Sequence, residues 1–236
     1  VNFPFTAGSA NTISSTVVEF VIVKADLDNI KKLRGLAITK ETTALKVVSG
    51  AFNDAAGNAL KATQIAATSY TVDSTNPTLD SADLDLNVNT LSLTFSETVS
   101  GTGSPVLVDV TAIMLQGNEV DGVTPARRLS AGSALQASVD STILVVSLHV
   151  DDVNYIKNTA SLCTEKADSL IAITANLIAD TAGEKVQAIL ASSPLEVTAY
   201  TEDASAPLLA SFTIDLSANT MTFNFDEPVE KSDFQP

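Results

Sequence analysis

The sequence predicts an all-β fold in which two-sheet Greek-key β-sandwich modules repeat in tandem, each with a short helical insert. Val, Ile, Leu and Thr are abundant and Gly and Pro interrupt them repeatedly, a composition that favours short strands. Many stretches alternate apolar and polar residues with a period of two, as strands with one buried face do. The stretch "DLDLNVNTLSLTFSETV" at 83–99 returns as "TIDLSANTMTFNFDEPV" at 213–229, an offset of 130 residues.

The repetition extends over most of the chain. Three further pairs of similar stretches follow in the same order, with offsets of 126 or 130 residues. They are 15–31 with 141–157, 52–58 with 178–184, and 70–77 with 200–207. A period of this length is too long for a solenoid repeat and fits a tandem array of whole domains.

The module boundary is predicted at the Asp-x-x-x-Pro segment, which occurs at Asp73–Pro77 and again one repeat later. Proline stiffens such a short polar linker. Division there gives the C-terminal part of a module at 1–72, one complete module at 73–202, and the N-terminal hairpin of a further module at 203–236. We therefore expect the chain to be a slice of a longer array.

Within the complete module, the period-two pattern predicts seven short strands, which imply a two-sheet Greek-key sandwich. The "NVN" break between the first two strands suits a tight hairpin, because Asn tolerates a positive φ. Asp151 and Asp152 are predicted to cap the start of a short helix. The predicted strands are 79–87, 90–97, 106–116, 126–132, 141–150, 168–174 and 194–201.

Composition argues against two classes of partner. The chain carries 13 Lys and Arg against 28 Asp and Glu, for a net charge of −15, whereas nucleic-acid binding needs clustered basic residues. No apolar run approaches the roughly 20 residues that a membrane helix needs. We therefore expect no nucleic-acid partner and no membrane insertion.

The residues that usually carry catalysis are scarce. His149 is the only histidine and Cys163 the only cysteine, and they align with Val23 and Ala37 in the other copy of the repeat. This alignment predicts a strand position for His149 and a packing position for Cys163. The sequence contains neither a Gly-x-Ser-x-Gly elbow nor a phosphate-binding glycine loop with its lysine. We expect no catalytic residue, no cofactor-binding residue and no enzymatic activity.

Acidic residues offer a better candidate site. The first two predicted strands run away from the linker and back, which brings Glu97 beside Asp73, and the "DTAG" loop should place Asp180 at the same end. Asp203 and Glu227 are the equivalents one repeat later. Calcium favours such clusters of oxygen ligands, so these five residues are predicted to hold structural calcium at the module junctions. The alternative is that Asp73 and Asp203 cap turns while both glutamates are exposed.

The ordered motifs resemble those of a known family. "DSTNP", "LTFSETV" and "FNDAAGN", with "DASAP", "FNFDEPV" and "IADTAGE" in the other copy, are similar to the bacterial Ig-like repeats of large surface and motility-associated proteins, the SwmB-like type. The chain departs from the pattern where Glu184 replaces the usual Asn, and its helical insert is longer than in the simplest members. The resemblance implies Ig-like modules in an extracellular or cell-surface stalk, adhesin or filament.

Together these observations predict a structural or adhesive extracellular protein that forms a stalk or filament. Its expected partners are neighbouring copies of itself or of its parent array, because 203–236 of one chain can complete 1–72 of the next by strand addition. The alternative is a carbohydrate- or ligand-binding module of a surface adhesin, for which the loop 117–128 is the best candidate site.

Overall fold

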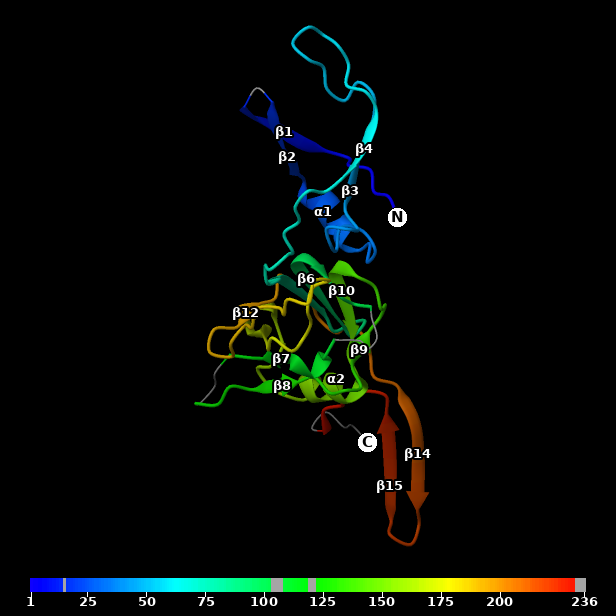
Figure 1. Ribbon diagram of the computed structural model, residues 1–236. Coiled ribbons are helices and arrows are strands. Elements are labelled where there is room, and N and C mark those ends of the chain that lie inside the picture. Colours follow the sequence, from blue (N-terminus) through cyan, green and yellow to red (C-terminus); the bar gives the residue numbers. More distant parts are fainter. Residues whose placement is uncertain (15, 103–107, 119–121, 232–236) are drawn as a thin grey trace.

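The computed structural model describes residues 1–14, 16–102, 108–118 and 122–231 (Figure 1). Strands in several sheets predominate over helices in its regular secondary structure. Two larger sheets lie in the middle of the chain, which we call the central region (73–202). The N-terminal segment (1–72) contributes two two-stranded sheets and a helix, and the C-terminal segment (203–231) contributes one hairpin. The predicted β-rich fold is confirmed.

The N-terminal segment contains β1 (Gly8–Ser14), β2 (Val17–Ile22), α1 (Lys24–Lys31), β3 (Ala44–Val47) and β4 (Thr63–Ala66). The central region contains β5 (Leu79–Asp85), β6 (Thr90–Val99), η1 (Val110–Ala112), β7 (Ile113–Gln116), β8 (Ala126–Arg128), β9 (Ala134–Leu135), β10 (Ser141–Ser147), α2 (Val150–Lys157), η2 (Lys166–Asp168), β11 (Leu170–Ile173), β12 (Leu195–Glu196) and β13 (Ala199–Thr201). The C-terminal segment contains β14 (Leu209–Asp215) and β15 (Thr220–Phe225).

The two larger sheets share one hydrophobic core. The strand orders are β13-β5-β6-β10-β9 and β12-β11-β7-β8, and β13 runs parallel to β5 while the other described neighbours are antiparallel. Leu91 and Leu93 of β6 are buried in the same cluster as Ile113 and Leu115 of β7. The alternating apolar residues therefore fill the space between the sheets, as the period-two pattern predicts.

The predicted strands 126–132 and 141–150 end early, at Arg128 and Ser147, and two other predicted strands differ more from the observed ones. Only 113–116 of the stretch 106–116 is a strand, because the Asp109 side chain accepts the Thr111 N–H at 3.0 Å and starts the 3-10 turn η1; residues 106 and 107 lie outside the described part. The stretch 194–201 divides into β12 and β13, which belong to different sheets. Val197 donates its N–H to the carbonyl of Ser169, just before β11, and Thr198 donates its N–H to the carbonyl of Ala82 in β5. The chain therefore crosses from one sheet to the other here.

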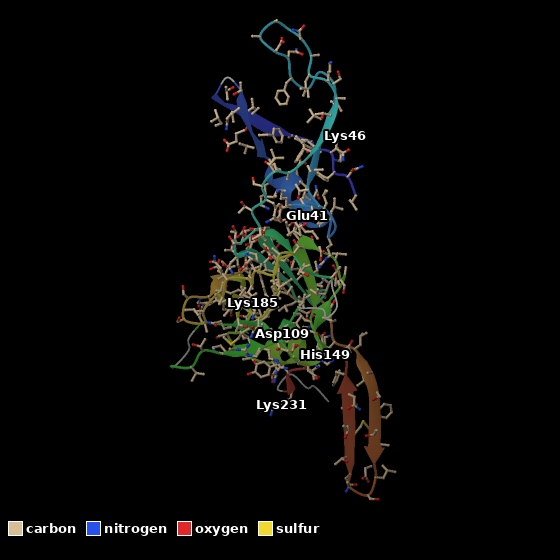
Figure 2. The ribbon with its side chains drawn as sticks, viewed as in Figure 1. Glu41, Lys46, Asp109, His149, Lys185 and Lys231 are labelled. Carbon is tan, nitrogen blue, oxygen red and sulfur yellow. The ribbon has the colours of Figure 1, made fainter. Side chains whose placement is uncertain are left out.

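The start of α2 also corrects two predictions. His149 lies on the central region (Figure 2) and is the N-cap of α2 rather than a strand residue, since its Nδ1 accepts the Asp151 N–H at 3.3 Å. Asp151 and Asp152 therefore occupy the first turn of the helix. Acidic side chains there interact favourably with the positive end of the helix dipole. Val153 and Ile156 of α2 are buried in the core.

Local geometry recurs at equivalent positions of the sequence repeat. Ala37 and Cys163 both adopt a positive φ, of 52° and 53°. Tyr70 donates its hydroxyl to the Ala37 carbonyl at 2.8 Å, and Tyr200 donates to the Cys163 carbonyl at the same distance. The packing role predicted for Cys163 is confirmed, because its side chain is buried in the core and burial raises the pKa of its thiol to about 12.

The two outer segments expose many apolar side chains. Leu91 and Phe95 of β6 are 0% and 2% exposed, whereas their counterparts Met221 and Phe225 of β15 are 49% and 41% exposed. Val18 and Phe20 of β2 are similarly open, at 48% and 45%. In Figure 1 the N-terminal segment and the β14–β15 hairpin extend from opposite ends of the central region.

Candidate functional site

Three carboxylates gather at one end of the central region. Asp73 comes from the stretch that precedes β5, Glu97 from the end of β6, and Asp180 from the loop after β11, and each offers an oxygen within 4.8 Å of the others. Glu97 and Asp180 are buried. The structure therefore brings together the three residues that strand direction predicts, which we call the first acidic cluster (Asp73, Glu97 and Asp180).

A lysine from the N-terminal segment reaches this cluster. Lys31 is the last residue of α1, and its Nζ lies 2.5 Å from Asp73 Oδ2 and donates to Glu97 Oε2. Its position in the last turn also suits the negative end of the helix dipole. Sequence reasoning did not identify Lys31, although the signal was present: "NIK" at the end of one repeated stretch matches "YIK" in the other.

The same arrangement occurs one repeat later. Lys157 is the last residue of α2, and its Nζ lies 2.7 Å from both Asp203 Oδ2 and Glu227 Oε2. The side chains of all three residues are at most 22% exposed. The structure therefore joins each predicted Asp and Glu pair through a lysine, an arrangement that we call a lysine bridge (Lys31 with Asp73 and Glu97; Lys157 with Asp203 and Glu227).

A turn fixes the aspartate of each lysine bridge. Asp73 Oδ1 accepts the Thr75 N–H at 3.1 Å, and Asp203 Oδ1 accepts the Ser205 N–H at 3.0 Å, which leaves Oδ2 directed to the lysine. The sequence left open an alternative in which the two aspartates cap turns and the two glutamates are exposed, and only its first half is right. Both aspartates cap turns, but Glu97 is buried and the Glu227 side chain is only 14% exposed, so neither glutamate is exposed as that alternative requires.

Electrostatics favour the charged form of the bridge at neutral pH. Burial works against ionisation of Lys31, but hydrogen bonds to Asp73 and Glu97 outweigh it and raise the pKa of the lysine. Burial also disfavours the Asp73 carboxylate, yet Lys31 and the Thr75 N–H hold its pKa below 3.8. The Asp73 contribution to stability is therefore complete above pH 3.8 and is lost as pH falls through the lowered pKa. The Lys31 contribution is complete below pH 10.5 and is lost as pH rises through the raised pKa.

Glu97 behaves differently from Asp73. Burial raises the pKa of this carboxyl, and the nearby charges of Asp73 and Asp180 add to the shift, while Lys31 opposes it. Protonation of Glu97 as pH falls through its raised pKa therefore favours the folded state. This gain partly offsets the stability that is lost when Asp73 is protonated in acid. Three carboxylates and one ammonium give the first acidic cluster with Lys31 an excess of negative charge.

Asp180 is held by its own loop. Its Oδ1 accepts the N–H groups of Ala182, Gly183 and Glu184 at 2.7–2.9 Å. Gly183 has a φ of 102°, a backbone conformation that glycine adopts without strain and that other residues rarely adopt. Asp180 Oδ2 is buried and has no hydrogen-bond partner among the described residues.

The first acidic cluster suits calcium in its donor chemistry, because calcium takes carboxylate oxygens and Asp180 Oδ2 has no other partner within the described ranges. Lys31, however, already provides a cation to Asp73 and Glu97. Calcium would have to displace the lysine or bind beside it. Calcium binding by Asp73, Glu97, Asp180, Asp203 and Glu227 stays a prediction.

Further contacts join the N-terminal segment to the central region. Arg34 donates through Nε and Nη2 to the two oxygens of Asp140 at 2.6 and 2.8 Å, and Nη2 also donates to Ser100 Oγ at 2.7 Å. Thr98 Oγ1 donates to the Asp28 carbonyl at 2.9 Å. The repeat places Ala160 at the position of Arg34, and an alanine side chain cannot make the Arg34 contact beside the second lysine bridge.

The loop 117–128 is only partly described, since residues 119–121 lie outside the described part of the chain. Gly117 donates its N–H to the Pro125 carbonyl at 2.8 Å, and Asn118 donates to the Ala167 carbonyl at 3.0 Å. Arg127 binds Asp152 and lies over the Tyr155 ring, 4.9 Å from its centroid. The carbohydrate- or ligand-binding role of this loop stays a prediction.

Comparison of the chain with protein-family models, with curated proteins and with solved structures finds no match. Within the described ranges, no helix has both the length and the apolar character needed to cross a bilayer.

Proposed function

We propose that the chain is a structural part of an extracellular, cell-surface array of tandem Ig-like β-sandwich modules of the SwmB-like kind, and that the array serves as a stalk or filament. The observation that carries the proposal is the repeated lysine bridge. A helix-end lysine of one stretch binds the linker aspartate and the second-strand glutamate of the next, and it does so at both boundaries that the sequence repeat predicts.

A stalk needs its modules held in a fixed relative orientation. Exposed ion pairs contribute little to this. Separation of a pair that is shielded from water is costly, because each charge is then left without its partner. Both lysine bridges are mostly shielded from water, and each aspartate is also fixed by a backbone N–H. The prolines that follow, Pro77 and Pro207, restrict the linker backbone further. These features support a stiff connection between successive modules.

The proposal includes no reaction. His149 acts as the N-cap of α2, and Cys163 is buried with a pKa of about 12, which disfavours the reactive thiolate. Both residues therefore have structural roles, and neither supports a nucleophile–base pair. We propose that the chain is not an enzyme.

Surface labelling tests the location. Antibodies raised against the whole chain are expected to label intact, unpermeabilised cells that express the native protein, and brief protease treatment from outside should remove the label. Immunogold particles should lie at a distance from the membrane, as a stalk requires. Label that appears only after permeabilisation would contradict an extracellular array. An unrelated cytoplasmic protein, probed on the same cells, controls for leakage.

A further inference from the structure

We propose that the apolar face of the β14–β15 hairpin is covered by residues 1–72 of a second copy of the chain, with β2 of that copy pairing antiparallel along the outer edge of β15. The inference rests on the proposed function, because it treats 203–236 and 1–72 as complementary parts of one module. It adds the identity of the partner and the register of the pairing.

The hairpin repeats a part of the central region that is covered. Asp215 pairs with Thr220 in β14–β15 as Asp85 pairs with Thr90 in β5–β6, and each pair of strands has one irregularity at the same place. Exposed apolar residues of the hairpin, in β14, β15 and the turn between them, correspond to buried residues of β5, β6 and the turn that joins them. The corresponding pairs are Leu209 with Leu79, Phe212 with Ala82, Ile214 with Leu84, Leu216 with Leu86, Met221 with Leu91, and Phe225 with Phe95.

The strand that covers β6 identifies the partner. β6 lies between β5 and β10, with Leu91 opposite Val146 and Ser92 opposite Val145. The sequence repeat places Phe20 of β2 at the position of Val146. In the described part of the chain, β2 is paired with β1 on one edge, and β15 is paired with β14 on one edge. The counterparts of β6 and β10 thus both have an edge at which another strand can add.

The repeat also sets the register. Residues of β6 correspond to those of β15 at an offset of 130, and residues of β10 correspond to those of β2 at an offset of 126. The observed pair Leu91–Val146 therefore corresponds to Met221–Phe20, on the core face. The same offsets convert Ser92–Val145 into Thr222–Glu19, on the opposite face. A one-residue slip would turn Phe20 away from Met221, so the apolar pattern specifies this register.

The second lysine bridge has a place for a third carboxylate. In the first acidic cluster, Asp180 is held beside β6 by a bridge to Val99 and by the Ser100 N–H, which donates to the Ala179 carbonyl. The counterpart of Asp180 is Asp54, in the "FNDAAGN" loop. Asp54 Oδ1 already accepts the Ala56 and Asn58 N–H groups, so its loop has a similar form. Asp54 of the second copy would then join Asp203 and Glu227 around Lys157.

Charge and geometry favour a second copy over the same chain. Residues 1–72 contain seven basic and five acidic side chains, a net charge of +2, whereas 203–236 contain one basic and six acidic, a net charge of −5. The two segments lie at opposite ends of the central region, so one chain does not bring them together in this arrangement (Figure 1). Pairing between copies uses two different surfaces, so it need not close and can extend into a filament.

Cysteine trapping tests the register directly. We would compare two double variants of the whole chain. The first carries Glu19→Cys and Thr222→Cys, at the two positions that the register places opposite each other. The second carries Glu19→Cys and Asn224→Cys. The second pair lies two residues out of register, at about 7–8 Å between Cα atoms, beyond the usual range for a disulfide. Under mild oxidation the first variant should form a ladder of dimers, trimers and longer species that collapses on reduction, several-fold more than the second. The controls each carry only one of the introduced cysteines. The native Cys163, which is buried, is present in both double variants and in these controls.

Three outcomes would overturn the inference: equal crosslinking of the two variants, a disulfide within one chain, or a monomer only. The unmodified chain provides an independent readout, because sedimentation should show a mass that grows with concentration, and Met221→Asp should remove that growth. Failure of both experiments, together with surface labelling of intact cells, would reject the second copy as partner and leave the proposed function standing. Loss of surface labelling would reject the proposed function itself.

Discussion

Replacement of Lys31 by methionine is expected to lower the free energy of unfolding by about 2 kcal/mol. Removal of one partner of a fully buried ion pair costs roughly 3–5 kcal/mol, because the remaining charge stays uncompensated. The side chains of Lys31 and Glu97 are 16% and 10% exposed, so water screens part of this effect. The variant would leave Asp73, Glu97 and Asp180 close together without the Lys31 ammonium. Urea denaturation followed by circular dichroism measures the change.

Two further variants separate the lysine bridge from general effects of substitution. Lys24 lies on the same helix, is 62% exposed and pairs with Asp28 at i+4, so Lys24→Met should cost less than about 0.5 kcal/mol. Glu97→Gln added to Lys31→Met should restore most of the lost stability, because it removes one of the uncompensated charges. If Lys31→Met and Lys24→Met unfold at the same urea concentration, the bridge contributes nothing measurable.

Replacement of Asp152 by alanine is expected to be more destabilising, by about 3–5 kcal/mol. The carboxylate is 0% exposed and accepts from the Ser130 N–H at 2.9 Å, from Ser133 Oγ at 2.7 Å and from Arg127 Nε at 2.8 Å. Alanine would leave these donors without their acceptor and the Arg127 charge without its partner. Thermal and urea denaturation of the whole chain should both show the loss.

The neighbouring residue provides the control for this change. The Asp151 side chain is 75% exposed, and Asp151→Ala should stay within about 0.5 kcal/mol of the unchanged chain. Burial disfavours the Asp152 carboxylate, but its hydrogen bonds and Arg127 lower its pKa below 3.8. The stability that it provides is therefore complete above pH 3.8 and is lost as pH falls through the lowered pKa. Equal effects of the two alanine variants would contradict the assigned role of Asp152.

The strands and the acidic cluster could be predicted because they depend on local pattern and on strand direction. The alternation of Leu91, Leu93 and Phe95 marks a buried face, and a tight turn returns the second strand to the linker, which places Glu97 near Asp73. Asp180 follows from the same reasoning applied to the loop after β11. These inferences need only the period of a strand and the position of a turn.

The lysine bridges could not be derived in the same way. Lys31 reaches Asp73 and Glu97 only because α1 points at the end of the central region, and this orientation depends on contacts such as Arg34 with Asp140, far apart in sequence. The role of Asp152 was missed for a similar reason. Its position at the start of α2 suggests a cap, whereas its partners Ser130 and Ser133 both come from the loop between β8 and β9.

The division of 194–201 into two strands shows another limit of pattern reasoning. The stretch is apolar enough for one continuous strand, but Val197 and Thr198 donate their N–H groups to different sheets. A strand that changes sheets has no signature in the periodicity of its own residues. The sequence repeat, by contrast, was a strong guide, since it links Lys31 to Lys157 and Tyr70 to Tyr200 once one member of each pair has been located.

The proposed function requires that the first lysine bridge fixes the N-terminal segment relative to the central region. Double electron–electron resonance tests it in the whole chain, with nitroxide labels on Ala25→Cys, an exposed position of α1, and on Lys185→Cys, in the central region (Figure 2). Cys163 is buried and should not react. We expect one narrow distance distribution, which broadens several-fold when Lys31→Met is added and stays narrow with Lys24→Met. A broad distribution in the native background, or one that Lys31→Met leaves unchanged, would contradict it.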